Sequence, residues 1–139
     1  MEKHTRQKYA GAESVLVVDG EESLAKMIGK TLRRLGYHVT IVTNSVEALE
    51  IFRKSPAAFN LIITDLAMVH MTGNRLAEEL GKIRADIPVI LCSGTGSLPV
   101  QEQAAATVRK MVKKPFMDDE LESSVRQVLD AAKASKQKP

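Results

Sequence analysis

The chain has 139 residues, enough for one domain with a hydrophobic core and too few for two domains of ordinary size. Hydrophobic residues make up 44% and charged residues 27%, which is typical of a globular domain and excludes a disordered chain. The net charge of +3 comes from basic residues near the two ends of the chain, so it does not indicate a nucleic-acid-binding surface.

Targeting and redox signals are absent from the sequence. No apolar stretch approaches the ~20 residues that span a bilayer, and the N-terminus is polar, so we expect a cytoplasmic protein. The single cysteine, Cys92, excludes an internal disulfide and any cysteine-based zinc site. We expect the folded domain to cover residues 13–131, between a flexible tail at 1–12 and a basic tail at 132–139.

Apolar runs of strand length alternate along the chain with amphipathic segments of helical period. In chain order, the predicted elements cover residues 15–19 (strand), 24–35 (helix), 39–42 (strand), 45–55 (helix), 61–64 (strand), 74–83 (helix), 88–92 (strand), 97–107 (helix), 108–112 (strand) and 118–129 (helix). Gly36 ends the first helix, and Asn44 or Ser45 caps the second. The helix predicted over 97–107 is Ala-rich and has only a weak apolar stripe.

This alternation predicts an α/β fold. Strands that are apolar on both faces imply a parallel sheet with helices on both sides. We expect a five-stranded, doubly wound, flavodoxin-like (βα)5 sheet of order 2-1-3-4-5 with right-handed crossovers. In that order the ligand crevice lies between the first and third strands, at their carboxyl ends.

Polar side chains follow four of the predicted strands. Asp19 follows the first, Asp65 the third, Ser93 the fourth and Lys114 the fifth. Because the carboxyl ends of parallel strands meet at one edge of a sheet, we expect these side chains to converge. Two carboxylates, a hydroxyl and an ammonium can handle one phosphoryl group and one divalent cation. Taken singly, Asp19 could be a helix cap and Ser93 a turn residue, so both interpretations stay open here.

With these residues in place, the chain resembles the receiver domain of two-component response regulators over about residues 13–131. The matching motifs are VLVVDGEE (15–22), DLAM with MTG (65–68 and 71–73), VILCSG (89–94) and KPF (114–116). Residues 60–94 most resemble receivers attached to hybrid sensor histidine kinases.

The resemblance implies a mechanism. Asp65 would accept a phosphoryl group from the phosphohistidine of a histidine kinase or of a phosphotransfer protein. Asp19, Asp65 and the backbone carbonyl of Ala67 would bind Mg²⁺. Lys114 and Ser93 would each contact a phosphoryl oxygen. The chain would be a phospho-acceptor with at most slow self-dephosphorylation, rather than a conventional enzyme.

Two positions depart from the family's pattern. Gly20 stands where the family has a second acid that binds the metal directly, so we expect a weakened Mg²⁺ site, with Glu21 as a candidate substitute ligand. Met111 stands where the family has an aromatic residue that moves together with the hydroxyl residue, here Ser93. A switch at this pair would therefore work through a different contact.

Three functions stay open on the sequence. The first is a working receiver, the second is a degenerate receiver that acts as an interaction module, and the third is a haloacid dehalogenase-type phosphatase with Asp19 as nucleophile. Glu21 is the wrong acid for the third, whose loop needs an aspartate there. We expect a downstream protein to contact the face formed by the fourth helix, fifth strand and fifth helix. We expect no nucleic acid or membrane partner, and a monomer or weak homodimer.

Overall fold

Five parallel strands form the centre of the computed structural model, which describes residues 8–95, 97–99 and 102–137. The strands are β1 (Ser14–Val18), β2 (His38–Val42), β3 (Leu61–Asp65), β4 (Val89–Ser93) and β5 (Val108–Lys113). The helices are α2 (Glu22–Arg34), α3 (Ser45–Lys54), α4 (Gly73–Ile83) and α5 (Asp118–Gln137), with a short 3-10 helix at Pro56–Ala58. The strand order is β2-β1-β3-β4-β5, which confirms the predicted fold.

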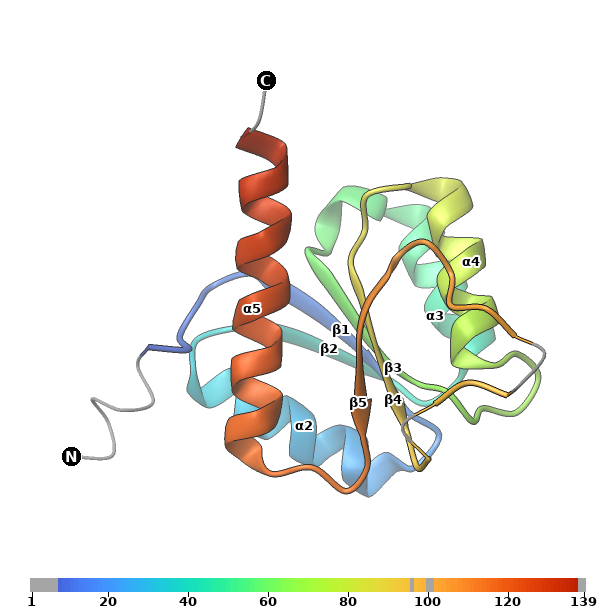
Figure 1. Ribbon diagram of the computed structural model, residues 1–139, viewed down its shortest axis with the longest axis horizontal. Coiled ribbons are helices and arrows are strands. Elements are labelled where there is room, and N and C mark those ends of the chain that lie inside the picture. The colour runs from blue at the N-terminus through green and yellow to red at the C-terminus, as the bar shows by residue number, and fades with distance from the viewer. Residues whose placement is uncertain (1–7, 96, 100–101, 138–139) are drawn as a thin grey trace.

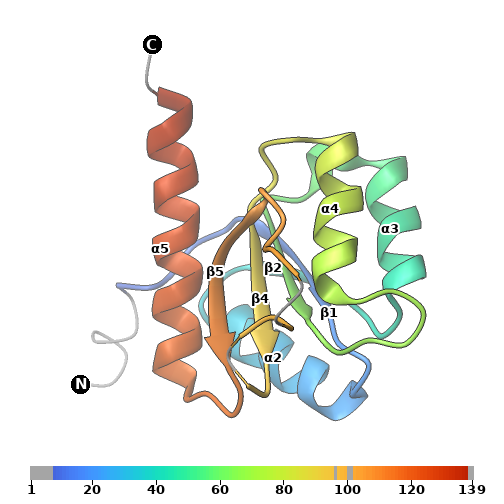
Figure 2. The same ribbon diagram turned by 45° about the vertical axis from the view of Figure 1, so that its right-hand side comes forward.

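Helices cover both faces of the sheet. Figure 1 shows α2 and α5 on one face, and Figure 2 shows α3 and α4 side by side on the other. Because successive strand residues point to opposite faces, Val15 and Val17 of β1 join the core under α2 and α5, whereas Leu16 and Val18 join the core under α3 and α4. The sheet is therefore buried on both sides, which explains why its central strands are apolar throughout.

Side-chain caps fix where two of the helices begin. The Asn44 carboxamide oxygen accepts hydrogen bonds from the N–H groups of Val46 and Glu47, at 2.7 and 3.2 Å, and starts α3. The Thr72 hydroxyl accepts from the N–H of Arg75 at 3.1 Å and starts α4. None of the helices in the described part of the chain is long and apolar enough to cross a membrane.

The helix predicted over residues 97–107 is wrong for the described part of that segment, because residues 97–99 and 102–107 form no helix. Tertiary hydrogen bonds replace the helical ones. The buried Asn74 carboxamide donates to the carbonyl of Gln103 and accepts from the N–H of Ala105, each at 2.8 Å. The Thr107 hydroxyl donates to the carbonyl of Ala77 at 2.9 Å. With a weak apolar stripe, the segment gains more from these bonds to α4 than from forming a helix.

The two ends also differ from the predicted tails. Residues 132–137 continue α5, which runs to Gln137. Of the tail predicted at 1–12, residues 1–7 lie outside the described residues. The next ones are fixed by tertiary bonds: the Tyr9 carbonyl accepts from the Tyr37 hydroxyl at 2.8 Å, and the Gly11 N–H donates to Leu35 at 3.1 Å.

Candidate functional site

Three charged side chains meet at the carboxyl edge of the sheet. The Lys114 ammonium lies 3.0 Å from Asp19 Oδ2 and 3.1 Å from Asp65 Oδ1, so it bridges the two carboxylates. Asp19 follows β1, Asp65 ends β3 and Lys114 follows β5. All strands are parallel, so residues up to 95 positions apart in the chain arrive at one edge. The peptide bond between Lys114 and Pro115 is cis.

Asp19 has two roles in this arrangement. Its Oδ1 accepts the N–H of Glu21 at 2.9 Å, which shapes the turn into α2, while Oδ2 bonds to Lys114. Its side chain is only 3% exposed, compared with 14% for Asp65. Asp65 is therefore the carboxylate of the pair that an incoming group can reach more easily.

The loop that follows Asp65 brings Gly73, the first residue of α4, back against the backbone of Asp65 and Leu66. The Leu66 N–H donates to Cys92 at 2.8 Å, and the Gly73 N–H donates back to Leu66 at 2.9 Å. A Cβ on Gly73 would clash with the backbone carbonyl oxygen of Asp65, so only glycine allows α4 to start this close to β3. This contact fixes the first turn of α4 against the backbone of Asp65.

Burial and charge act against each other in the site. Burial raises the pKa of Asp65 and the negative charge of Asp19 adds to this, although the hydrogen bond from Lys114 opposes it. Burial alone would lower the pKa of the Lys114 ammonium, but its hydrogen bonds to Asp19 and Asp65 outweigh that effect and raise it. Lys114 is therefore charged at neutral pH. Burial raises the pKa of the neighbouring Cys92 thiol to about 12, which makes it a neutral core residue rather than a nucleophile.

A shallow pocket of about 730 Å³ opens over the two carboxylates. It is lined by Asp19, Gly20, Glu21, Thr43, Asn44, Asp65, Ala67, Met68, Val69 and His70. The predicted ligand residues Asp19, Asp65 and Ala67 thus share one pocket with Glu21. Among the described residues, no group of three or more histidine, cysteine, aspartate or glutamate side chains is placed so that it could hold a metal ion by itself.

The donor set fits Mg²⁺ in kind. Mg²⁺ takes hard oxygen ligands, keeps several waters and is commonly bound by one or two carboxylates plus substrate phosphate. Gly20 adds no carboxylate, so the site carries less negative charge than one with a third acid. A side chain there would meet only Met68 Sδ at 3.9 Å and the Thr43 carbonyl at 4.0 Å, so space does not exclude an acid.

Ser93 lies at the same edge, one residue beyond the Cys92 that pairs with Asp65. It is 4% exposed, and its hydroxyl is hydrogen-bonded to the hydroxyl and to the N–H of Thr95, both at 3.2 Å. Sequence reasoning missed Thr95, although hydroxyl residues at alternate positions 93, 95 and 97 were a signal for it. Met111, in β5, is half-buried and pairs with Leu91.

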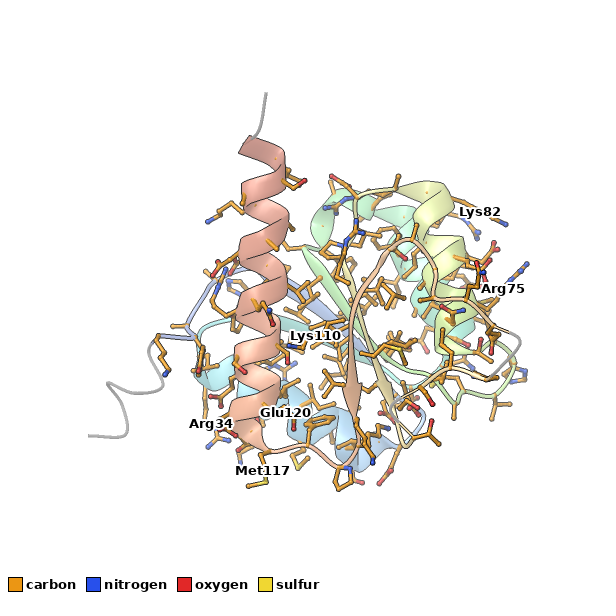
Figure 3. The ribbon with its side chains drawn as sticks, viewed as in Figure 1. Arg34, Arg75, Lys82, Lys110, Met117 and Glu120 are labelled. Atoms are coloured by element: carbon orange, nitrogen blue, oxygen red, sulfur yellow. The ribbon has the colours of Figure 1, made fainter. Side chains whose placement is uncertain are left out.

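An exposed apolar patch borders the charged site. Met27 of α2 is 49% exposed and Met117, just before α5, is 72% exposed, and Figure 3 shows Met117 at the base of that helix. A groove beside them is lined by Glu21, Leu24, Met27, Lys114, Pro115 and Phe116.

The chain thus has a doubly wound parallel sheet with two carboxylates and a lysine at its carboxyl edge, and the comparisons name its family. The chain matches the response regulator receiver domain over residues 15–126. It therefore belongs to the receiver domain family of two-component systems.

Several relatives can be compared directly. The "Probable transcriptional regulator ycf27" of Porphyra purpurea is 34% identical over 121 residues, which cover 86% of this chain and 49% of the relative. The receiver protein CpdR of Brucella abortus is 28% identical over 119 residues, covering 85% of this chain and 98% of CpdR. The chain thus spans about half the length, or less, of several curated relatives, while it matches CpdR almost end to end.

Solved structures agree on the fold. A receiver domain from Clostridium thermocellum superimposes with a TM-score of 0.78 at 25% identity, covering 88% of this chain and 98% of that one. The receiver domain of the sensor histidine kinase PA1611 from Pseudomonas aeruginosa superimposes with a TM-score of 0.76 at 20% identity, covering 86% and 99%. That structure is described as having a magnesium ion coordinated in its active-site cleft.

Proposed function

We propose that Asp65 accepts a phosphoryl group from the phosphohistidine of a histidine kinase or phosphotransfer protein. A carboxylate oxygen of Asp65 attacks phosphorus, an O–P bond forms, and the P–N bond to the donor imidazole breaks. The imidazole nitrogen keeps the electron pair and takes up a proton. The observation that carries the proposal is the Lys114 ammonium, held 3.1 Å from the more accessible carboxylate of a two-carboxylate site.

The surrounding groups have separate roles in this proposal. Lys114 is close enough to Asp65 to form an ion pair with one oxygen of a phosphoryl group bound to Asp65. The Ser93 hydroxyl donates a hydrogen bond to a second oxygen of that phosphoryl group. Asp19, Asp65 and the Ala67 carbonyl would hold Mg²⁺, with Glu21 as a candidate further ligand. When bound, the ion would offset the negative charge that develops on the transferred group.

The partners follow from the surface. An apolar patch lies beside Lys114 and consists of Leu24, Met27, Phe116 and Met117. Such a patch suits contact with a protein donor that brings its phosphohistidine to Asp65. We assign the output to the exposed surface of β5 and α5, where Figure 3 shows Lys110 next to α5. The helix predicted over residues 97–107, which we expected on that face, is not formed in the described residues. We therefore assign the non-helical segment 102–107 to the output face instead. We infer a cytoplasmic location and at most slow self-dephosphorylation.

Phosphorylation with a small donor tests the proposal. Acetyl phosphate is incubated with the protein, with and without Mg²⁺, and intact mass is measured. A carboxylate oxygen of Asp65 would displace acetate, adding one phosphoryl group in the presence of Mg²⁺. Asp65→Asn should abolish the gain in mass, while Asp86→Asn, which removes a surface carboxylate 58% exposed, should leave it unchanged.

Gly20 favours one alternative, a degenerate receiver that acts as an interaction module without phosphorylation. Position 20 carries no acid, and in the described part of the chain no group of three or more metal-binding side chains is placed to hold an ion. A folded protein that gains no mass at high Mg²⁺, but does so after Gly20→Asp, would establish this alternative.

A further inference from the structure

The Ser93 hydroxyl is already engaged in the resting protein. It lies 3.2 Å from the Thr95 hydroxyl oxygen, and it accepts the Thr95 N–H at 3.2 Å. The Thr95 hydroxyl donates in turn to the carbonyl of Ser97 at 2.9 Å and accepts the Ser97 N–H at 3.3 Å. Three residues thus form a continuous ladder of hydrogen bonds that leads away from the site.

The number of hydroxyl protons indicates which residue donates the hydrogen bond between the Ser93 and Thr95 hydroxyls. A hydroxyl carries one proton, and Thr95 uses its proton toward the Ser97 carbonyl. All the contacts of the ladder are therefore satisfied together when Ser93 donates the bond between the two hydroxyls. Its only proton is committed to Thr95, and it has none left for a second acceptor.

We propose that Thr95 is a positioning residue that holds the Ser93 hydroxyl in a resting orientation and competes with the phosphoryl group for its proton. This inference rests on the proposed function, in which Ser93 donates to a phosphoryl oxygen on Asp65. To donate there, Ser93 must break its bond to Thr95. Thr95 therefore slows phosphorylation of Asp65. When the bond from Ser93 to Thr95 breaks, the hydrogen bonds between Thr95 and Ser97 are affected in turn.

The ladder of hydrogen bonds also offers a way for phosphorylation to change the structure without an aromatic residue at position 111, where this chain has Met111. Once Ser93 leaves, the Thr95 N–H loses its acceptor and the Thr95 hydroxyl loses a donor, so the start of the β4–β5 connection must rearrange. The far end of the same connection stays attached to α4 through Asn74.

Initial rates of phosphorylation by acetyl phosphate test the proposal in a double-mutant cycle. Thr95→Val keeps the shape and removes the hydroxyl, and since Thr95 is exposed the fold should tolerate it. We expect phosphorylation to be about threefold to tenfold faster, the change expected from losing one neutral hydrogen bond that holds the resting state. Thr95→Ser restores the hydroxyl and should return the rate to that of the wild type.

The cycle is completed in the Ser93→Ala background. There Thr95→Val should have no effect, because the competing proton is gone. An unchanged or slower rate for Thr95→Val, or the same acceleration with and without Ser93, would overturn the inference while leaving Asp65 as acceptor. A wild-type protein that is never labelled overturns the proposed function and this inference with it.

Discussion

At the level of single residues, the charge in the site depends on Lys114 and Gly20. Two carboxylates and one ammonium give the site a net charge of about −1 when all three are ionised. A third acid at position 20 would make this −2 and would add an oxygen at the pocket. We therefore expect the strength of cation binding to depend on position 20, where glycine has no side chain.

Gly20→Asp should tighten Mg²⁺ binding by on the order of tenfold, because a carboxylate is added within a few ångströms of the cation. Calorimetric titration with Mg²⁺ measures this directly, without phosphorylation. Gly20→Asn is the matched control, since it adds a similar side chain without charge and should give a smaller gain. Equal affinities for wild type and Gly20→Asp would show that position 20 does not reach the ion.

The raised pKa of Asp65 predicts a pH-dependent effect on stability. The folded state holds this proton more tightly than the unfolded chain, so the free energy of unfolding falls as pH rises from the ordinary carboxyl value of 3.8 through the raised pKa. Asp65→Asn removes this loss. Its stability relative to wild type should therefore be greater at neutral pH than below pH 3.8, as measured by urea unfolding across that range. A difference that does not vary with pH would contradict the assigned shift.

At the level of elements, the connection into β5 depends on α4. Asn74 is 1% exposed, and its carboxamide satisfies one carbonyl and one N–H of the segment 102–107. Gly81 of the same helix lies close to the Thr107 side chain. One face of α4 thus serves as the support for a segment that has no helix of its own in its described residues.

Asn74→Ala should destabilise the protein by about 1–3 kcal/mol, because two partly buried backbone groups lose their hydrogen-bond partner. Denaturant unfolding gives the energy, and hydrogen exchange should show faster exchange of the Ala105 amide. Asn74→Asp keeps the acceptor for Ala105 and should preserve much of that amide's protection. If Asn74→Ala exchanged no faster at Ala105, the segment would have to be held by other contacts.

At the level of the whole molecule, Arg126 of α5 joins parts that are distant in the chain. Its guanidinium contacts the Glu13 carboxylate at 2.6 and 3.1 Å, the Ala10 carbonyl at 3.2 Å and the Tyr37 hydroxyl at 3.0 Å. Arg126 therefore connects the start of the described chain, the turn between α2 and β2, and the last helix. Only 15% of the Arg126 side chain is exposed.

Arg126→Leu should destabilise the protein by about 2–3 kcal/mol at neutral pH, since it leaves Glu13 without its charged partner. The hydrogen bond from Arg126 is the main cause of the lowered pKa of Glu13. That contribution is complete above the ordinary glutamate value of 4.5 and is lost as pH falls through the lowered pKa. The effect of the substitution should therefore shrink in acid. Arg34→Leu, at an exposed arginine on α2 (Figure 3), should change stability by little at either pH.

Much of this arrangement could be predicted from the sequence, for identifiable reasons. The strands were predictable because burial on both faces makes them apolar throughout. Asp19, Asp65 and Lys114 were expected to lie together because parallel strands end at one edge of the sheet. The missing helix at 97–107 was not predictable, since the competing bonds come from Asn74, some 30 residues away. Arg126 was missed for the same reason: its partners lie in other segments of the chain and local pattern does not reveal them.

The ammonium shared by Asp19 and Asp65 has one more consequence. The protein carries its own counter-ion between the two carboxylates, which offsets part of their repulsion, so we expect the folded state not to depend on a bound metal. Removing divalent ions with EDTA should leave the melting temperature unchanged. Added Mg²⁺ should raise it only through ligand linkage, as a logarithmic function of ion concentration above the dissociation constant. A large loss of stability in EDTA would mean that the lysine alone is not enough.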